Sequence, residues 1–553
     1  MKAYLEPLKE ISEYCAVEQE LLTGHKVSHI TGCIDSQKCH LIAGLSEHFP
    51  IRVIITYHDL KAQELLEEYR LYDSNVMYYP SKDVIFYNAD IHGNAIVKER
   101  LKVLKKLLLG EPMTVIACID GGIDKLLPLK KIQEKVLQLK EADVCEVEAL
   151  AKHFVTLGYE RQAQVELPGE FAVRGGIIDI FPLTEEAPVR IELFGDEIDT
   201  IRVFDVDSQR TVERISEVTI FPAGEYLFTE QELKKGTDKI LTEAKKTEEV
   251  FRAERKNEEG MQIRRTIEEF LENLEYCQGQ IALDSYVTFF CNDTISFFDY
   301  FDEHTLFVLD EPSRLVEKGE TTELEFRESM TGRLEKGYCL PSQAESIFSY
   351  RELLARFSSR TTLLLSTLDY SFDLLKANVR YDIPAKSVNP YNSNFELLVK
   401  DLTAWKKRGY RMIVVTSSGT RASRLAEDLR GYELPAFFDN NPERLVQKGE
   451  IMVIQGNLRR GFEYPALKFV MISESDIFGV EKKKKKKKSQ YSGQKLQSFH
   501  ELTFGDYVVH EDQGVGIYRG IEKIEVDKVT ADYIKIEYGG GSFLYVSTTS
   551  LDR

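Results

Sequence analysis

Strand-like and helix-like segments alternate along the first 120 residues of the chain. Short apolar runs rich in β-branched residues predict strands at 26–32, 52–57, 76–80 and 114–120, with helical patterns between them at 36–49, 59–72 and 94–109. A strand returns parallel to its neighbour only through a crossover, which is usually a helix. The alternation therefore predicts a parallel sheet with helices on its faces, and Asp59 as the N-cap of the second helix.

The pattern changes after residue 125. From about 145 to 222, short strands and turns rich in Gly and Pro predict an inserted, mostly β module, and strands return at 304–312 and 361–367. Residues 230–278 have a helical pattern, with one apolar face formed by Ile263, Ile267, Phe270, Leu271 and Leu274. A second strand–helix alternation predicts another α/β unit, with helices at 395–407 and 420–430 and strands at 411–416, 451–456 and 468–474. The segment 501–553 is predicted to be all β.

The net charge of the chain limits how it can bind DNA. It has 91 Asp and Glu against 72 Lys and Arg, a formal net charge of −19. Such a surface disfavours a protein that coats DNA, because affinity for DNA comes largely from neutralising phosphates. Seven consecutive lysines, Lys482–Lys488, are interpreted as a linker extended by charge repulsion, since no aromatic residue interrupts the run to stack on bases.

The eight cysteines are dispersed, and no two have C-x-x-C spacing. This usage is typical of reduced thiols in a cytoplasmic protein and argues against a zinc site. The N-terminus lacks the apolar core of a signal peptide, and no run approaches the roughly 18 apolar residues of a membrane span. We therefore expect a cytoplasmic protein without a metal ion. We also expect a monomer.

The junction after the first predicted strand, Gly32–Cys39, has part of the pattern of a phosphate-binding loop. Such a loop is written G-x-x-x-x-G-K-[ST], because its glycines let backbone N–H groups wrap the phosphates and its hydroxyl holds Mg²⁺. Gly32 and Lys38 fit this pattern, but Gln37 replaces the second glycine and Cys39 replaces the hydroxyl. A strand–turn–helix that binds no nucleotide is therefore the favoured interpretation.

Short motifs that resemble parts of nucleotide-hydrolysing enzymes occur further along the chain. Asp310 and Glu311 follow the apolar run LFVL, as the acidic residues of a Walker B strand do. Without an intact phosphate loop this pair has little to act on, so we interpret it as a relic or a strand end. Arg459, Arg460 and Glu474 suggest an arginine finger and a helicase-type motif, although an arginine pair in a loop is more often a solvated or salt-bridged feature.

Three stretches occur in the order found in one family. They are PGEFAVRGGIIDIFP (168–182), FGDEIDTIRVFDVDSQRT (194–211) and GDYVVHEDQGVGIYRGI (505–521). With them, essentially the whole chain resembles the N-terminal half of bacterial transcription-repair coupling factors. The first two stretches belong to a module shared with the excision-repair protein UvrB, and the third resembles the CarD-type RNA-polymerase-interacting domain.

The resemblance implies a multidomain α/β protein. Its regions are 1–125 and 216–385 as two parts of a UvrB-like domain with a degenerate phosphate loop, 126–215 as an inserted α+β module that binds UvrA, 390–478 as a second α/β domain of uncertain role, 479–498 as a lysine-rich linker, and 499–553 as a small all-β, CarD-like or Tudor-like barrel.

The chain differs from UvrB and from complete coupling factors in two ways, and each difference removes an activity that the resemblance would otherwise imply. UvrB has an intact phosphate loop and a long β-hairpin that clamps DNA, whereas the interval here from Tyr78–Pro80 to Ala95 is too short for that hairpin. Coupling factors continue into an ATP-dependent DNA translocase, which is absent from this chain, and the last domain is expected to be clipped at Arg553. ATP, Mg²⁺ and most DNA contacts are therefore assigned to the absent motor, and this chain is expected to be a non-enzymatic adaptor without a cofactor.

The resemblance also assigns partner-binding residues. Residues that contact UvrA map onto Arg174, Arg190 and Phe194, although Arg190 paired with Glu192 and Phe194 in the core are open alternatives. The edge that joins the RNA polymerase β subunit by strand addition maps onto Lys523, Ile524 and Glu525, with a plain strand inside a barrel as the alternative. A UvrB-like ATP-dependent helicase and a CarD-like transcription regulator remain as other functions.

Overall fold

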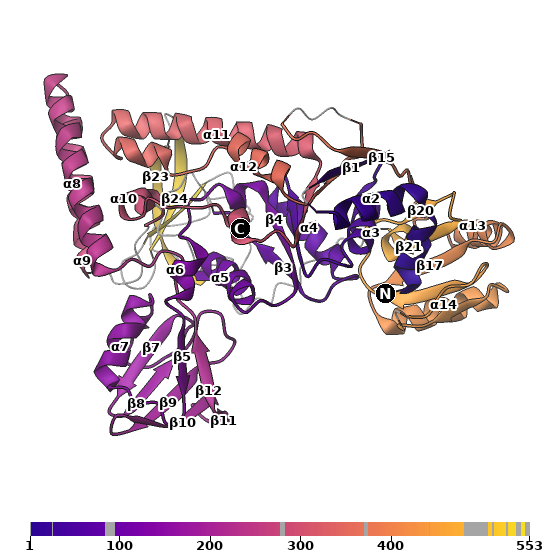
Figure 1. Cartoon of the computed structure of the whole chain (residues 1–553), viewed down its shortest axis with the longest axis horizontal. Coiled ribbons are helices and arrows are strands. Elements are labelled where there is room, and N and C mark those ends of the chain that lie inside the picture. Colours follow the sequence, from indigo (N-terminus) through magenta and orange to yellow (C-terminus); the bar gives the residue numbers. More distant parts are fainter. Residues whose placement is uncertain are drawn as a thin grey trace. The chain divides into compact units, whose positions relative to one another are not determined.

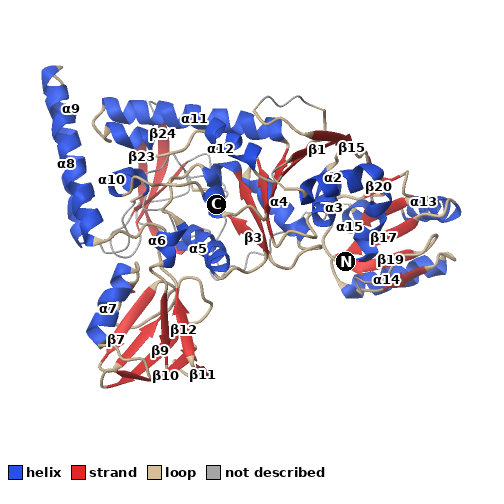
Figure 2. Ribbon diagram, in the orientation of Figure 1, coloured by secondary structure: helices blue, strands red, loops and turns tan. Residues whose placement is uncertain are grey.

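The computed structural model describes residues 2–24, 26–82, 94–276, 283–369, 374–441, 443–479, 507–510, 514–526, 529–537 and 543–547. The chain divides into two compact units, Met1–Val480 and Glu481–Arg553. Figures 1 and 2 show their helices and strands. In this part of the chain, no helix is both long and apolar enough to cross a membrane. The interval expected to be too short for a DNA-clamping hairpin and the lysine run lie outside the described residues.

Seven described strands form a parallel sheet in the order β15-β1-β14-β13-β2-β4-β3. Strands β1, β4, β13 and β14 are buried along their whole length, as expected when helices cover both faces. Segments on both sides of the insertion therefore build one sheet. The strands are β1 (Val27–Thr31), β2 (Ile51–Thr56), β3 (Val76–Tyr79), β4 (Met113–Cys118), β13 (Thr305–Asp310), β14 (Thr362–Leu365) and β15 (Val379–Asp382).

Helices follow these strands as the alternation predicts. The N-cap of α4 is His58, whose ring Nδ1 accepts a hydrogen bond from the backbone N–H of Leu60 at 3.1 Å. The prediction of Asp59 as N-cap was wrong by one residue, because its carboxylate accepts instead from the Tyr78 hydroxyl at 2.6 Å. The helices of this region are α1 (Lys2–Leu5), α2 (Ser12–Leu22), α3 (Asp35–Leu45), α4 (Asp59–Tyr69), α5 (Asn94–Leu108), α6 (Leu129–Gln133), α10 (Val287–Phe290), α11 (Pro312–Glu335) and α12 (Tyr350–Arg356).

The insertion has its own sheet, with α7 (Val147–Thr156) beside it (Figure 2). Six described strands lie in the order β11-β10-β9-β8-β7-β6, and β12 (Glu217–Ile220) pairs separately with β5 (Leu137–Lys140). The expected boundary at 215 therefore falls too early, because β12 belongs to the insertion by its pairing. The other strands are β6 (Glu160–Arg161), β7 (Glu170–Arg174), β8 (Ile177–Ile180), β9 (Val189–Phe194), β10 (Glu197–Phe204) and β11 (Thr211–Ile215).

The predicted helical region forms two long helices, α8 (Glu230–Ala253) and α9 (Asn257–Tyr276). The predicted apolar face of α9 is confirmed, since Ile263, Ile267 and Phe270 are buried and Leu271 and Leu274 pack against the same cluster. Burial of this face, rather than helix propensity alone, stabilises such a pair.

The region after β15 forms the second α/β sheet, in the order β16-β20-β21-β17-β19-β18. It begins at β16 (Lys386–Ser387), earlier than the expected boundary at 390, because β16 pairs with β20. Its core merges with that of the first sheet in one apolar cluster. The remaining elements are β17 (Arg411–Thr416), β18 (Ala436–Phe438), β19 (Ile451–Gln455), β20 (Phe462–Tyr464), β21 (Phe469–Ser473), α13 (Phe395–Lys407), α14 (Gly419–Gly431) and α15 (Glu474–Phe478).

The second unit contains an antiparallel sheet in the order β22-β23-β24-β25. The strands are β22 (Tyr507–His510), β23 (Gly514–Val526), β24 (Val529–Glu537) and β25 (Phe543–Ser547). Among the described residues, no pairing joins β22 to β25, and these four strands are the part of the expected small barrel that the structure describes.

Candidate functional site

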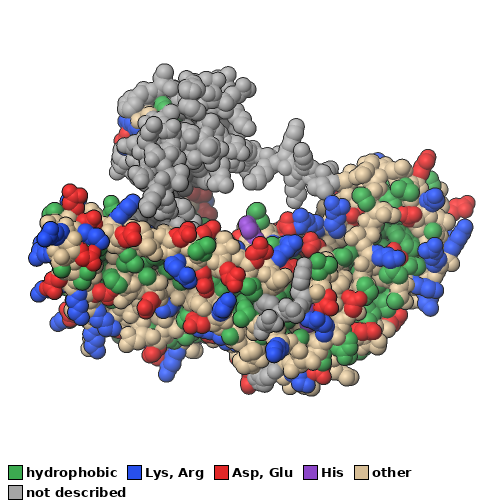
Figure 3. All heavy atoms as spheres, turned by 90° about the horizontal axis from the view of Figure 1, so that it is seen from above, with side chains coloured by type: hydrophobic (Ala, Val, Ile, Leu, Met, Phe, Trp, Pro, Cys, Tyr) green, Lys and Arg blue, Asp and Glu red, His purple; other side chains and the backbone are tan. Residues whose placement is uncertain are grey.

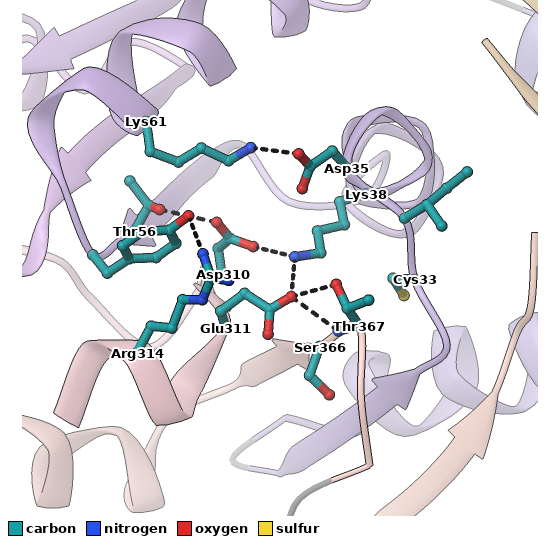
Figure 4. Close-up of polar contacts among 12 residues, drawn as sticks. Cys33, Asp35, Lys38, Thr56, Lys61, Asp310, Glu311, Arg314, Ser366 and Thr367 are labelled. Carbon is teal, nitrogen blue, oxygen red and sulfur yellow. Dashed lines mark hydrogen bonds and ion pairs between the residues drawn. The ribbon is translucent and has the colours of Figure 1, made fainter. Parts of the chain in front are cut away.

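The lysine of the degenerate phosphate loop is buried in an ion pair within the protein (Figure 4). Lys38 Nζ lies 2.7 Å from Asp310 Oδ1 and 2.7 Å from Glu311 Oε1. Burial alone would lower the pKa of Lys38, but the two carboxylates outweigh it and raise that pKa. The charge of Lys38 is thus satisfied by the acidic pair at the end of β13. No local sequence pattern indicates that these distant residues meet.

Other groups at the loop also take protein partners. Gln37 accepts from the Ile34 backbone N–H at 3.0 Å and donates to the Ile383 carbonyl at 2.6 Å. Gly32 has a φ of 75°, and a Cβ there would collide with the Asp382 carboxylate. Cys39 is fully buried, and burial raises the pKa of its thiol. The loop is therefore filled by contacts to the segment that leads into the second α/β domain.

The suggested arginine finger is instead part of a contact between the two α/β domains. Arg459 forms an ion pair with Glu64, and the Arg460 backbone N–H donates to Ser36 Oγ at 3.1 Å. Glu474 accepts from the Ser417 backbone N–H at 2.7 Å and pairs with Arg421. The arginines and Glu474 therefore hold structural contacts, which is the alternative that the sequence favoured for the arginine pair.

Arg174, Arg190 and Phe194 lie on one face of the insertion sheet. Arg190 and Phe194 alternate along β9 with core residues on the opposite face, and Arg174 lies two strands away on β7. The Phe194 side chain is 85% exposed, so the alternative that it fills the core is wrong. The structure thus places the three predicted residues on one face of the sheet, with Phe194 open to solvent.

Asp179 joins the two arginines. It is 1% exposed and accepts from Arg190 Nε at 2.6 Å, from Arg190 Nη2 at 2.9 Å, and from Arg174 Nη2. The hydrogen bond to Asp179 raises the pKa of Arg190. The alternative that Arg190 pairs with Glu192 is wrong, because Asp179 lies directly opposite Arg190 on β8, while Glu192 pairs with Arg202.

The two signature stretches of the insertion shape this face. Gly175 and Gly176 connect β7 and β8, and a Cβ on Gly176 would lie 2.8 Å from the Leu193 carbonyl oxygen. In the second stretch, Asp205 accepts from the Ser208 backbone N–H at 2.9 Å, and Gln209 turns back with a φ of 57°. Gln209 Oε1 then accepts from Arg190 Nη2 at 3.1 Å.

Sequence reasoning missed several residues of this face. Arg202 and Arg214 continue the row that begins with Asp179 and Arg190, since the four residues are cross-strand neighbours on β8, β9, β10 and β11. Period-two alternation in the run DTIRVF could have placed Arg202 on the outer face. No local pattern indicates the role of Gln209.

In the second unit, the predicted residues Lys523, Ile524 and Glu525 lie on β23. Their backbone pairs with Asp532, Ala531 and Thr530 of β24. Strand β22 pairs with the opposite edge of β23, but only along Gly514–Ile517. Among the described strands, the edge of β23 that faces away from β24 is therefore unpaired along 521–526.

Charge on the first unit is mixed. Acidic and basic side chains are interspersed over the face shown in Figure 3. Within the described residues, no three His, Cys, Asp or Glu side chains gather as a metal site would require. The arginine row of the insertion is thus a local basic feature of an acidic chain.

Comparison with known proteins identifies two domain types in this chain. Residues 137–226 match the model of the UvrB interaction domain, and residues 502–553 match that of the CarD-like/TRCF RID domain. The chain is thus a multidomain α/β protein that combines these two modules.

The resemblance to the N-terminal portion of transcription-repair coupling factors is confirmed. The Transcription-repair-coupling factor of Bacillus subtilis is 30% identical over 99% of this chain and 46% of its own length. Those of Staphylococcus epidermidis and Staphylococcus aureus are 29% and 28% identical over 95% of this chain and 44% of theirs. The chain spans about half the length of these relatives.

Proposed function

We propose that this chain is the adaptor portion of a transcription-repair coupling factor. The insertion recruits UvrA through Arg174, Arg190 and Phe194, and the C-terminal unit joins the β subunit of RNA polymerase along Lys523–Glu525. A stalled polymerase would thereby be linked to nucleotide excision repair in the cytoplasm. ATP, Mg²⁺ and most DNA contacts belong to the motor of the full-length relatives.

The observation that carries the proposal is the exposed Phe194 on the same face of the insertion sheet as two arginines. A rigid aromatic ring and arginine side chains are the residue types that dominate interface energy. The open edge of β23 offers backbone N–H and C=O groups for strand addition. The proposal is tested by asking whether purified chain retains purified UvrA and purified β subunit; failure to retain UvrA would overturn the assignment of the insertion.

The chain should not hydrolyse ATP. Lys38, which would contact the β- and γ-phosphates in a working loop, is neutralised by Asp310 and Glu311, and Cys39 cannot hold Mg²⁺ as a hydroxyl does. Phosphate release with and without DNA should equal that of buffer alone. DNA-stimulated turnover that is lost in a Lys38→Ala variant would support the competing helicase function instead.

Ile524→Arg should weaken capture of the β subunit at least about tenfold, because a charge on the pairing strand opposes close approach of a partner strand. Capture by immobilised chain is the measurement. The variant should still bind UvrA, because UvrA binding is assigned to the other unit. Unchanged capture of the β subunit would show that this edge is wrongly assigned.

A further inference from the structure

We infer that Asp179 and Gln209 are positioning residues, which hold Arg174 and Arg190 so that the free N–H groups of these arginines donate hydrogen bonds to a carboxylate of the partner protein. This inference rests on the proposed function and specifies the chemistry of the same surface. Neither residue was singled out by the sequence, and neither needs to contact the partner.

The first support is the geometry of the two guanidinium groups. A guanidinium has five N–H donors. Asp179 receives Nε and Nη2 of Arg190 and Nη2 of Arg174, and Gln209 receives a second bond from Arg190 Nη2. In the contacts among described residues, the Nη1 groups of both arginines remain available. The N–H groups bonded to Asp179 and Gln209 thus fix the two guanidinium groups, and the remaining N–H groups keep one orientation.

The second support is the fixed setting of the two holding residues. Asp179 is 1% exposed on the central strand β8, so it cannot move without disturbing the sheet. Arg190 also lies over the ring of buried Phe204, with 4.5 Å between the guanidinium carbon and the ring centroid. Gln209 is fixed in turn, because its Nε2 donates to the Val206 carbonyl at 2.8 Å. Fixed donors lose less conformational entropy on binding than mobile ones do.

The third support is the cleft beside these groups. It has a volume of about 380 Å³ and is lined by Gln164, Arg174, Ile177, Arg190 and Gln209. Two arginines and one aspartate give these groups a net positive charge, and arginine forks match the planar geometry of a carboxylate. The carboxylate of an aspartate or glutamate therefore matches the charge of these groups and the planar geometry of the arginine forks.

The opposite role for Asp179 predicts the opposite result. If its carboxylate competed with the partner for the arginines, removing its charge would strengthen binding. If it positions them, removing its charge frees the guanidinium groups and weakens binding. The sign of the change in affinity therefore separates the two roles.

The experiment measures the affinity of purified UvrA for the full chain and its variants. Asp179→Asn should weaken binding about tenfold or more, and Gln209→Ala about three- to tenfold, in line with one lost hydrogen bond. In an Arg190→Ala background, Gln209→Ala should have no further effect, because its only task at the site is to hold Arg190. Tighter binding by Asp179→Asn, or an undiminished effect of Gln209→Ala in that background, would overturn the inference.

Two controls separate this inference from the proposed function. Wild-type binding of UvrA tests the function, whereas the ratios between variants test the positioning role. A crystal structure of the Asp179→Asn chain gives a readout that needs no partner. Arg174 and Arg190 should leave their present orientations in it, and unchanged orientations would contradict the positioning role whether or not UvrA binds.

Discussion

Replacing both Arg174 and Arg190 with glutamate should abolish UvrA binding, with a loss of roughly 100-fold or more. Each substitution removes a guanidinium fork and places a negative charge where we propose an acidic partner group binds, and losing a buried charged partner at an interface costs about 2–5 kcal/mol. Titration calorimetry or biolayer interferometry with purified UvrA measures the effect. Polymerase β-subunit capture by the same variant should be unchanged, because it depends on the other unit.

A matched control is present in the same chain. Arg252 and Arg264 share Glu248 in the way that Arg174 and Arg190 share Asp179, but they lie on the helices α8 and α9. Reversing both charges there changes the net charge equally and should leave UvrA affinity within about twofold, since surface ion pairs contribute little.

Phe194→Ala separates a lost contact from a lost fold. The Phe194 ring is exposed, so its removal should not destabilise the sheet, yet it should weaken UvrA binding about tenfold if the ring is an interface anchor. Full binding by both the Phe194→Ala variant and the double arginine variant would contradict the assignment of this face.

The elements of the α/β domains were predictable because their signal is local. The helix expected at 395–407 has those bounds in the structure, since its apolar residues recur on one face and Asn394 caps its first turn. Strands such as β4 and β13 are buried on both faces and therefore read as continuous apolar runs.

Boundaries and partners were less predictable because they depend on pairing between distant residues. Nothing near Glu217 indicates that its strand pairs with Leu137–Lys140, so the insertion was expected to end too early. The alternative that paired Arg190 with Glu192 was wrong, because directly opposite residues on neighbouring strands lie closer than residues two apart on one strand. Composition does not determine which residues of neighbouring strands pair. The structural roles of the motif glycines and of the turn at Gln209 could therefore be seen only in the paired strands.

In the degenerate phosphate loop, too, the local features were predictable and the contact between distant residues was not. Loss of the second glycine and of the hydroxyl was readable from Gln37 and Cys39. The ion pair of Lys38 could not be predicted in this way, because Lys38 and Asp310 are 272 residues apart in the chain. The degenerate phosphate loop and the acidic pair after the LFVL run, which are separate motifs in the sequence, form one buried ion-pair cluster in the structure.

Lys38→Met should therefore lower the free energy of unfolding by about 3–5 kcal/mol, because Asp310 and Glu311 stay buried and lose the lysine that is bonded to both of them. Both partners of the ion pair are nearly excluded from solvent, with Lys38 and Asp310 side chains each 2% exposed. Urea-induced unfolding at constant pH measures the change. A loss of this size is a large part of the stability of an ordinary domain.

The pH dependence of the deficit follows from the directions of the pKa shifts. In the wild-type chain, burial opposes ionisation, but the pKa of Lys38 is raised by its carboxylates and that of Glu311 is lowered by Lys38. Their contribution is present between the ordinary values of 4.5 for Glu and 10.5 for Lys and is lost outside them. Without Lys38, burial of the Glu311 carboxyl is no longer offset by that lysine and favours its protonated form, so the deficit of the variant should shrink as the pH falls from about 8 towards about 5.

Lys61→Met is the matched control for this prediction. Lys61 lies beside the same loop and pairs with Asp35 at 3.1 Å and with Glu64 at 3.8 Å. The Asp35 and Glu64 side chains are 56% and 39% exposed, so their charges stay hydrated when the lysine is removed. The control should cost no more than about 1 kcal/mol. Adding Glu311→Gln to Lys38→Met should restore part of the lost stability, because it removes one uncompensated charge. Equal losses for Lys38→Met and Lys61→Met would show that the buried cluster does not hold the first sheet together.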